Sequence, residues 1–310
     1  MKPLGQYPAP AHVIAHISDT HLLAGDKLLY GAVASGDHLV AAIDQLANSG
    51  IRPQAIVFTG DLADLGEPEA YETLKKIVEP AAAKIGAKII WVMGNHDERT
   101  EYSRILFGLE PTEQPQDRVY DIDGLRIISF DTTVPGYHHG AITDAQLEWL
   151  AEELSTPADH GTIVALHHPP VPTPLLWAME MLELQGQERL AEVLRGTDVR
   201  AILGGHLHYS THSTFAGIPV SVAAATCYTL ALTEKDRLLS GVDAGQAMNI
   251  VHVYDDRLVH SIIPIGSNVE ITGFSTDYVA QIEAMTPEQR LEMFSRKKSG
   301  FNVGDDSAQE

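Results

Sequence analysis

Polar side chains that can bind metals follow several apolar runs of the sequence, at the point where each run ends. Ala55–Phe58 is one such run; its four apolar residues predict a buried strand, and Thr59-Gly60-Asp61 follow it. A carboxylate just beyond the carboxyl end of a strand lies where open α/β sheets bind their ligands. Gly60 lets the backbone pass close to a bulky or charged group. One Gly-Asp pair after a strand is usually a simple turn, so the interpretation depends on the other strand ends.

Four further strand ends carry the same kind of chemistry. The polar residues at the five ends are Asp19 and His21, Asp61, Asn95 and His96, His167, and His206 and His208. In an extended segment, residues i and i+2 point to the same side, so the two members of an Asp-x-His or His-x-His pair can converge on one point. Because neighbouring strands lie only about 4.8 Å apart, we expect the five ends to surround a common volume.

The donor types indicate which metals would bind there. Carboxylate, imidazole and amide donors without thiolate suit Fe, Mn, Zn or Co, and suit Ca²⁺ or Cu(I) poorly. The donors are too many for one tetrahedral site. We therefore expect two metal ions that share one carboxylate, and Asp61, on the central strand end, is the natural bridge.

Each motif also has an ordinary explanation when it is taken alone. Asp-x-His is usually an accident of a loop, and Gly94-Asn95-His96-Asp97 is a plausible turn. His167-His168 before two prolines reads equally well as a strand end with partly buried imidazoles. All of these motifs occur here in order, each after an apolar run, which favours the metal site over coincidence.

Composition limits the classes of partner. The 310 residues include 42 acidic and 21 basic side chains, with a formal net charge of −21. Such a surface repels polyanions, which argues against a nucleic-acid polymer as partner, whereas a small anionic substrate suits a site whose positive charge comes from metal. A single cysteine, Cys227, rules out an internal disulfide and favours a reducing compartment. The first ten residues do not resemble a signal peptide and no apolar run approaches about 20 residues, so we expect a cytoplasmic protein without a transmembrane segment.

Periodicity predicts the elements that must position these residues. The expected helices are Gly36–Asn48, Glu69–Ile85, Arg99–Phe107, Thr143–Leu154, Glu183–Arg195 and Gln281–Lys297. Strands alternate with helices over the first two thirds of the chain and dominate the last third. This pattern favours an α/β layered fold with two sheets over one wound sheet. We expect one domain over residues 11–265, and a C-terminal helix with a polar tail over residues 266–310.

With these motifs assigned, the chain resembles the calcineurin-like metallophosphoesterases, whose ordered blocks are D-x-H, G-D-x-x-D, G-N-H-D, H and G-H-x-H. Every block is present without substitution. Within that superfamily the chain is most similar to the actinobacterial class III 3′,5′-cyclic nucleotide phosphodiesterases, from about Ala15 to Pro264. The resemblance implies a four-layer αββα fold with two mixed β-sheets flanked by helices, and it suggests a homodimer.

The resemblance also implies a role for each site residue. Asp19, His21 and His208 would hold a first metal, usually iron, whereas Asn95, His167 and His206 would hold a second, usually Mn or Zn, with Asp61 bridging the two. His96 would lie beside the leaving group as a catalytic residue, oriented by Asp64. The residues expected to contact substrate are His21, Asp61, Asn95, His96, His138 and His208.

The implied reaction is hydrolysis of cyclic AMP to 5′-AMP. A hydroxide that bridges the two metals would attack phosphorus in line, while protonated His96 would donate a proton to the leaving 3′ oxygen. A broader phosphodiesterase, a phosphomonoesterase or a nucleotide pyrophosphatase of the same superfamily remains the alternative. A catalytically dead metal-binding scaffold would have lost a ligand or His96, and neither is lost.

Two stretches bear on substrate selection. His138 and His139 lie in a polar loop from which they could reach a phosphate or a ribose, or they are plain loop histidines. Pro172–Leu184 carries several large apolar residues that would cover a base, form a dimer contact or simply join the core.

Overall fold

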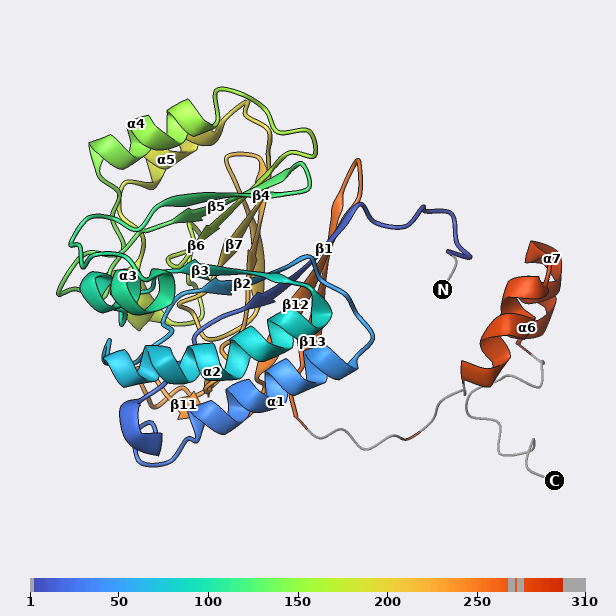
Figure 1. The fold of residues 1–310 in the computed structure, drawn as a ribbon, viewed down its shortest axis with the longest axis horizontal. Coiled ribbons are helices and arrows are strands. Elements are labelled where there is room, and N and C mark those ends of the chain that lie inside the picture. The colour runs from blue at the N-terminus through green and yellow to red at the C-terminus, as the bar shows by residue number, and fades with distance from the viewer. Residues whose placement is uncertain (1–2, 267–270, 272–275, 298–310) are drawn as a thin grey trace. The chain divides into compact units, whose positions relative to one another are not determined.

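The computed structural model describes residues 3–266, 271 and 276–297. Within them, Pro10–Gly266 forms one compact unit. It contains two mixed β-sheets (Figure 1). The first sheet has the strand order β13 (Leu258–Pro264), β12 (Ala247–Val253), β1 (His12–Ile17), β2 (Ala55–Thr59) and β3 (Lys88–Val92). The second has the order β4 (Arg118–Ile122), β5 (Leu125–Phe130), β6 (Thr162–Leu166), β7 (Val199–Gly204), β9 (Ile218–Val222) and β8 (Thr211–Phe215).

Both sheets have a parallel centre, and this puts the functional strand ends together. β1, β2 and β3 run parallel to one another, and so do β5, β6, β7 and β9. β12 and β13 extend the first sheet in antiparallel pairings, as β4 and β8 do at the two edges of the second. A separate antiparallel pair is formed by β10 (Thr229–Leu230) and β11 (Gly241–Val242). Parallel neighbours share one carboxyl edge, where ligands of α/β sheets are expected.

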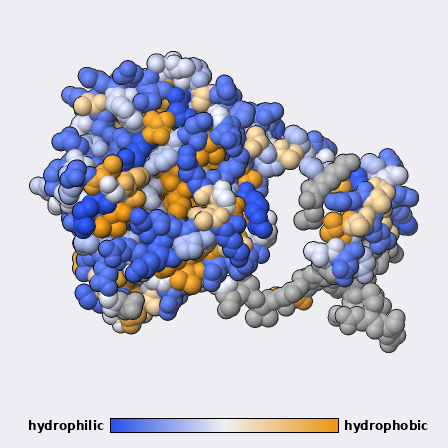
Figure 2. Space-filling model, viewed as in Figure 1, coloured by the Kyte–Doolittle hydropathy of each residue, from blue (hydrophilic) through white to orange (hydrophobic). Residues whose placement is uncertain are grey.

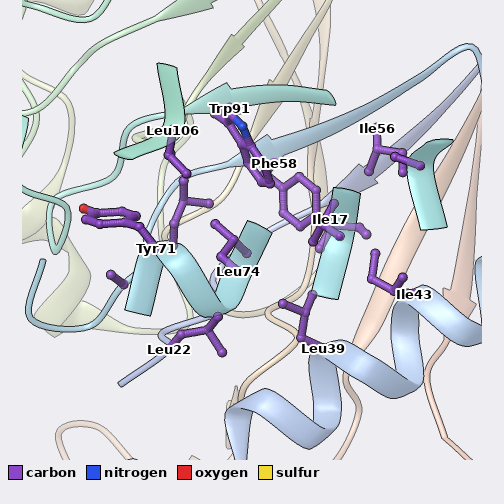
Figure 3. Packing of buried hydrophobic residues seen from close by; sticks show 14 of the residues in the cluster. Ile17, Leu22, Leu39, Ile43, Ile56, Phe58, Tyr71, Leu74, Trp91 and Leu106 are labelled. Atoms are coloured by element: carbon purple, nitrogen blue, oxygen red, sulfur yellow. The ribbon is translucent and has the colours of Figure 1, made fainter. Parts of the chain in front are cut away.

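Helices cover the outer face of each sheet. The first sheet buries its outer face against α1 (Ser35–Asn48), α2 (Pro68–Ile85) and α3 (Arg99–Phe107). In Figure 3, Leu39 and Ile43 of α1 and Leu74 of α2 point at Phe58 and the side chains around it. The second sheet packs against α4 (Asp144–Glu153) and α5 (Gln187–Leu194).

A third apolar core lies between the two sheets. Val57 and Ile90 of the first sheet pack there with Ile163 and Leu203 of the second, and all four are fully buried. The order helix, sheet, sheet, helix confirms the predicted four-layer fold. In Figure 2 the drawn face of residues 10–266 is mostly hydrophilic, with hydrophobic side chains in separate groups.

Most predicted helices agree with the structure, and two differ. Thr143 caps α4 with the predicted capping box. The helix predicted from Glu183 begins only at Gln187, because Gly186 precedes it with a left-handed backbone (φ 75°). The helix predicted over Gln281–Lys297 is instead α6 (Val279–Ala284) and α7 (Pro287–Arg290), followed by a π-helical turn at Leu291–Ser295. Thr286 and Pro287 stop the first helix and cap the second.

Outside Pro10–Gly266, residues 3–9, 271 and 276–297 belong to a second unit, which includes α6, α7 and a 3₁₀ turn at Thr276–Tyr278. The predicted domain limits, 11–265 and 266–310, stay a prediction. Much of the predicted polar tail, residues 298–310, lies outside the described residues. Among the described helices, none combines the length and apolar character needed to cross a membrane.

Candidate metal centre

The five predicted strand ends meet at the carboxyl edge of the two sheets, joined by backbone hydrogen bonds. After β1 and β2, the Asp19 amide donates to the Gly60 carbonyl at 3.1 Å, and the His21 amide to the Asp61 carbonyl at 2.9 Å. The two sheets are joined as well, because the His206 amide after β7 donates to the Asp19 carboxylate at 3.1 and 3.2 Å. The backbone itself therefore holds these side chains together.

Five of the seven predicted ligands have a left-handed backbone, a conformation that residues other than glycine seldom adopt. Their φ angles are 52° at Asp19, 42° at His21, 49° at Asp61, 69° at His206 and 56° at His208. Each turn bends the chain sharply just beyond its strand, which directs the side chain into the space between the loops. Clusters of such conformations are typical of functional sites.

Two glycines let the loops approach closely. A Cβ at Gly60 would lie 2.5 Å from His167 Nδ1, and one at Gly94 would lie 2.1 Å from the Asp61 amide nitrogen. Both distances are far below van der Waals contact. Gly60 therefore has the role predicted for it, and Gly94 has the same role on the neighbouring loop.

The first predicted ligand group is present as a compact cluster. Asp19, His21, Asp61 and His208 each offer one ligand atom, and these atoms all lie within 4.8 Å of one another. His21 Nε2 lies 3.2 Å from His208 Nε2 and 3.4 Å from Asp61 Oδ2, and His208 Nε2 lies 3.4 Å from Asp19 Oδ1. Ligands bound at about 2.1 Å to one metal lie roughly 3.0–3.4 Å apart, so these separations fit a shared ion.

The second group lies on the other side of Asp61. His167 Nε2 is 3.2 Å from Asp61 Oδ2 and 3.1 Å from Asn95 Oδ1. His206 stacks edge-on against His167, with ring centroids 5.0 Å apart. The same Asp61 oxygen thus faces both groups, which is the arrangement that a bridging carboxylate requires.

The outer nitrogens of the four predicted histidine ligands are all occupied by oxygen acceptors. Nδ1 of His21, His167 and His208 bonds to Asp64 Oδ1 at 2.8 Å, to the Thr59 carbonyl at 2.7 Å and to the Tyr228 carbonyl at 3.0 Å, and Nε2 of His206 bonds to the Leu182 carbonyl at 3.1 Å. Since these oxygens can only accept, each of these nitrogens carries the proton. In the neutral rings the other nitrogen is left with its lone pair, as metal-bound histidines require.

Lone pairs therefore face lone pairs inside the cluster. His21 Nε2 faces His208 Nε2, and His167 Nε2 faces two oxygens that cannot donate. Such contacts repel unless a proton or a cation lies between them. The residues present therefore fit two cations, one of which Asp19, His21, Asp61 and His208 could hold and the other Asp61, Asn95, His167 and His206.

Without metal, the pKa values show that the carboxylates of the site favour a positive charge beside them. Burial alone would lower the pKa of His167, but the Asp61 carboxylate outweighs it and raises that pKa to about 9. Burial would raise the pKa of Asp61, yet His167 and His21 hold it well below its usual value. Burial, together with the charge of His167 or His21, lowers the pKa of both His206 and His208 to about 3.

Comparison with known proteins agrees with this geometry. The family model described as calcineurin-like phosphoesterase matches residues 12–210, which contain all the predicted ligands. The chain belongs to the calcineurin-like phosphoesterase family. It is 58% identical over 269 residues to the cAMP/cGMP dual specificity phosphodiesterase of Mycobacterium tuberculosis, covering 87% of this chain and 84% of that protein.

Two further comparisons extend the likeness. A probable cyclic nucleotide phosphodiesterase of Rhodococcus erythropolis is 54% identical over 266 residues, covering 86% of this chain and 88% of that protein. The crystal structure of a dimetal phosphatase from Danio rerio superposes with a TM-score of 0.60 at 17% identity, covering 82% of this chain and 96% of that one. This structural likeness shows that the two proteins share a fold.

In this phosphoesterase Asp64 lies against two imidazoles, that of His96, which the sequence predicts, and also that of His21. Its carboxylate accepts the hydrogen bond of His21 and lies 3.5 Å from His96 Nδ1. His96 Nδ1 instead donates to the backbone carbonyl of Asp64 at 2.8 Å. The residue therefore orients two imidazoles at once, one through its side chain and one through its backbone.

His138 lies beside the predicted ligands, whereas its neighbour His139 does not line the same cavity. The Asn95 amide nitrogen lies 2.9 Å from His138 Nδ1, a contact that turns the amide oxygen of Asn95 toward His167. The rings of His138 and His96 lie 4.9 Å apart. His138 thus helps to position a predicted ligand, in addition to facing the substrate space.

Sequence reasoning gave no role to two buried residues of this phosphoesterase. Asp97, the last residue of the G-N-H-D block, accepts hydrogen bonds from the amides of Leu62, Ala63 and Gly94 and so ties the loop after β2 to the loop after β3. His168 donates from Nε2 to the His138 carbonyl at 3.2 Å and takes the Thr132 hydroxyl at Nδ1, 2.8 Å away. Because both of its nitrogens are engaged, His168 is a support for the loop rather than a ligand.

A cavity of about 290 Å³ opens over the cluster, and its two sides differ in chemistry. Its polar floor consists of His21, Asp61, Asn95, His96, His138, His206 and His208. Its apolar wall consists of Tyr30, Met179, Leu182, Tyr228, Leu230 and Leu239. Met179 and Leu182 come from the 3₁₀ helix Trp177–Leu182, so part of the predicted apolar stretch Pro172–Leu184 does face the site, while Leu176 and Ala178 are buried in the protein.

Proposed function

We propose that this protein hydrolyses 3′,5′-cyclic nucleotides, with cyclic AMP converted to 5′-AMP. The observation that carries the proposal is the cavity itself, in which a floor of metal-binding donors and His96 faces a wall fit for an apolar, planar group. The relatives from Mycobacterium tuberculosis and Rhodococcus erythropolis support it, because the names of both refer to cyclic nucleotide hydrolysis. A broader phosphodiesterase of the same family is the second candidate, because the floor alone would accept many phosphoesters.

Two bound metal ions, which we propose to be iron with manganese or zinc, would supply the positive charge that binds the phosphate and activates water at neutral pH. Asp19, His21 and His208 would hold one ion and Asn95, His167 and His206 the other, with Asp61 between them. Only two carboxylates belong to this set, so the loaded site keeps a net positive charge and attracts an anionic substrate despite the acidic exterior.

His96 is the residue that we propose to move a proton. Its Nδ1–H is held by the Asp64 carbonyl, which fixes the ring and leaves Nε2 as the nitrogen that can reach substrate. When the ring is doubly protonated, Nε2–H donates to the 3′ oxygen as the P–O3′ bond breaks, so that this oxygen leaves as a hydroxyl group. General acid catalysis of this kind contributes typically about 10²–10⁴-fold.

Three further proposals concern the setting of the enzyme. A cytoplasmic location is supported by the single cysteine, Cys227, which is buried and free. A homodimer rests on the resemblance and would be tested by light scattering. The net charge of −21 supports a small-molecule substrate rather than a nucleic-acid polymer.

The first experiment is to load the purified protein with Mn²⁺ and compare turnover of 3′,5′-cyclic AMP, 5′-AMP, a dinucleotide pyrophosphate and bis(4-nitrophenyl) phosphate. Asn95→Ala and His96→Ala are the site variants. We expect cyclic AMP to give 5′-AMP, 5′-AMP to remain intact, and both variants to lose most activity.

Other outcomes would change the proposal in a defined way. Cleavage of only the activated aryl diester would keep the metal centre and remove cyclic nucleotides as the substrate. Activity that persists without the side chains of Asn95 and His96 would overturn the site assignment itself.

A further inference from the structure

An exposed tyrosine, Tyr30, stands at the edge of the cavity on an anchored turn. The residues on either side of it, Leu29 and Val33, are 1% and 8% exposed and pack against Ala225 and Cys227. Tyr30 itself is 71% exposed and lines the cavity. The turn is closed by backbone hydrogen bonds between Leu29 and Val33 at 2.9 and 3.0 Å. The ring is thus presented to solvent by a well-anchored segment.

The backbone at Tyr30 is in a conformation unusual for such a side chain. Its φ angle is 52°, in the left-handed region that bulky residues rarely adopt. Among the described residues outside the strand-end ligands, only Tyr30, Asp123 and Ala216 share this feature without being glycine. Each of the three directly precedes a glycine that is also left-handed, Gly31, Gly124 or Gly217, as in tight hairpin turns. The turn therefore fixes where the Tyr30 ring is presented, and the case for a functional role rests on the exposure of the ring and on its place in the cavity lining.

A second tyrosine connects Tyr30 to the metal-binding floor. The Tyr228 ring lies 5.6 Å from the Tyr30 ring at 74° and 4.5 Å from the His208 ring. Burial, and then a hydrogen bond with Tyr30, raise the pKa of Tyr228. The Tyr228 carbonyl also accepts the hydrogen bond of His208, so its position is tied to the floor. The two rings lie edge to face and lead from a predicted ligand, His208, to solvent.

We infer that Tyr30 and Tyr228 form the nucleobase subsite of this cavity, in which the base of the substrate stacks on the exposed Tyr30 ring while its phosphate occupies the floor. This inference rests on the proposed function. The pair of rings starts next to His208, so a ligand whose phosphate sits on the floor can extend its base along the two rings. Leu230 and Leu239 complete this part of the wall with apolar side chains.

The chemistry of the subsite predicts tolerance between bases. Stacking depends on the π-face that every base has, and it contributes roughly 1–3 kcal/mol per base on alanine substitution. Within the lining of the wall, only the two tyrosine hydroxyls can form side-chain hydrogen bonds, so the wall offers few groups that could distinguish one base from another. Adenine and guanine nucleotides should therefore bind with similar affinity, and both should depend on Tyr30.

The test measures binding and does not require turnover. Mn²⁺-loaded native protein, Tyr30→Leu and Tyr30→Phe would be titrated by calorimetry with 5′-AMP, 5′-GMP and ribose 5-phosphate. We expect Tyr30→Leu to weaken both nucleotides about tenfold, to leave ribose 5-phosphate within about twofold, and Tyr30→Phe to resemble the native protein. Tyr137→Leu is the matched control, because Tyr137 is an exposed tyrosine (61%) that does not line the cavity.

Tyr30→Trp provides a direct reading of stacking that does not depend on the leucine variant. Its fluorescence should be quenched by 5′-AMP and unaffected by ribose 5-phosphate. An unchanged ratio of nucleotide to ribose 5-phosphate affinity in Tyr30→Leu, or a tryptophan that does not respond to 5′-AMP, would overturn the inference. If Tyr30 governs nucleotide binding but cyclic AMP is not cleaved, the subsite stands and the proposed reaction fails.

Discussion

The floor and the wall of the same cavity are built in different ways. The floor comes from strand ends whose backbones are hydrogen-bonded to one another and turned by left-handed residues such as Asp61 and His206. The wall comes from a turn, a 3₁₀ helix and the segment around β10 and β11, which are joined to the floor at their ends, as where His206 bonds to the Leu182 carbonyl and His208 to the Tyr228 carbonyl. The fold thus fixes where phosphate chemistry takes place, and the loops can change what is attached to the phosphate.

The largest effect is expected at Asp61, because it faces both halves of the floor. Asp61→Asn should lower activity on every phosphoester by at least about 10⁴-fold, since bound metals contribute several kcal/mol to the transition state. Elemental analysis should show loss of bound metal. Asp44→Asn, on an exposed position of α1, is the control and should keep both. Full metal content with full activity in Asp61→Asn would contradict the bridging role.

Substitution of His96 tests whether the floor donates a proton to the leaving group in addition to binding metal. His96→Ala should slow cyclic AMP hydrolysis by about 10²–10³-fold, because the ribose oxygen leaves poorly unless it is protonated. Bis(4-nitrophenyl) phosphate should lose less than about tenfold, since nitrophenolate leaves without a proton. The ratio of the two rate losses is the measurement. Equal losses on both substrates would show that His96 has another role.

Asp64 separates the positioning of metal from the positioning of the proton donor. Asp64→Asn should weaken metal binding about 10–100-fold, because the carboxylate holds the metal-facing tautomer of His21. The His96 contact should survive, since it uses the Asp64 backbone. Competition with a chelator measures the affinity, and the leaving-group ratio at saturating metal should stay native. A native affinity combined with an altered ratio would show that the Asp64 carboxylate acts on His96 rather than on His21.

The affinity of the floor for metal should depend on pH, because one of its predicted ligands, His167, is protonated in the metal-free protein. In the metal-free protein the pKa of His167 is raised to about 9, so below that pH the ring must lose a proton before it can bind metal. The apparent affinity should therefore fall as pH falls, roughly tenfold per pH unit for each proton released. Calorimetry at pH 7.5 in two buffers of different ionisation enthalpy should detect release of at least one proton. Absence of release would mean that His167 is already neutral.

The smallest effect is expected at the rim of the wall. Leu239→Ser should raise the KM for cyclic AMP less than about fivefold and leave kcat unchanged, because Leu239 is 43% exposed and only part of its surface can be covered by substrate. Turnover of bis(4-nitrophenyl) phosphate is the comparison, and a similar rise in its KM would show that the wall does not distinguish nucleotides.

The same contrast separates what the sequence could predict from what it could not. Floor residues such as Asp19 and His206 were found because a polar ligand type directly after an apolar strand is informative by itself. Tyr30 gave no such signal, since an aromatic residue in a loop looks like any other apolar residue until the chain is folded. Met179 belongs to the stretch Pro172–Leu184, for which covering a base was only one of three interpretations. Gly31 marks a turn in the sequence, but nothing there shows that this turn would lie beside the strand ends.

Some local features of the structure could not be predicted from the sequence either. The sequence of β8, Thr211–Phe215, does not predict a strand, because it is mostly polar and pairs with β9 only at the edge of the sheet. The atoms through which Asp64 contacts His96 and His21 could not be predicted, because the choice between a carboxylate and a carbonyl depends on the path of the loop. Asp97 could have been found, as its block was recognised, but nothing in the spacing shows that it binds three amides.

The separation of the ligands along the chain has a consequence for folding. Asp19 and His206, which contact each other, are 187 residues apart, and each ligand group needs histidines that lie beyond β6. During synthesis the first hundred residues expose Asp19, His21, Asp61 and Asn95, yet neither group is complete until β7 has been made and both sheets have joined. The metals therefore bind the finished fold, stabilise it by mass action, and favour chains that have assembled correctly over those that have not.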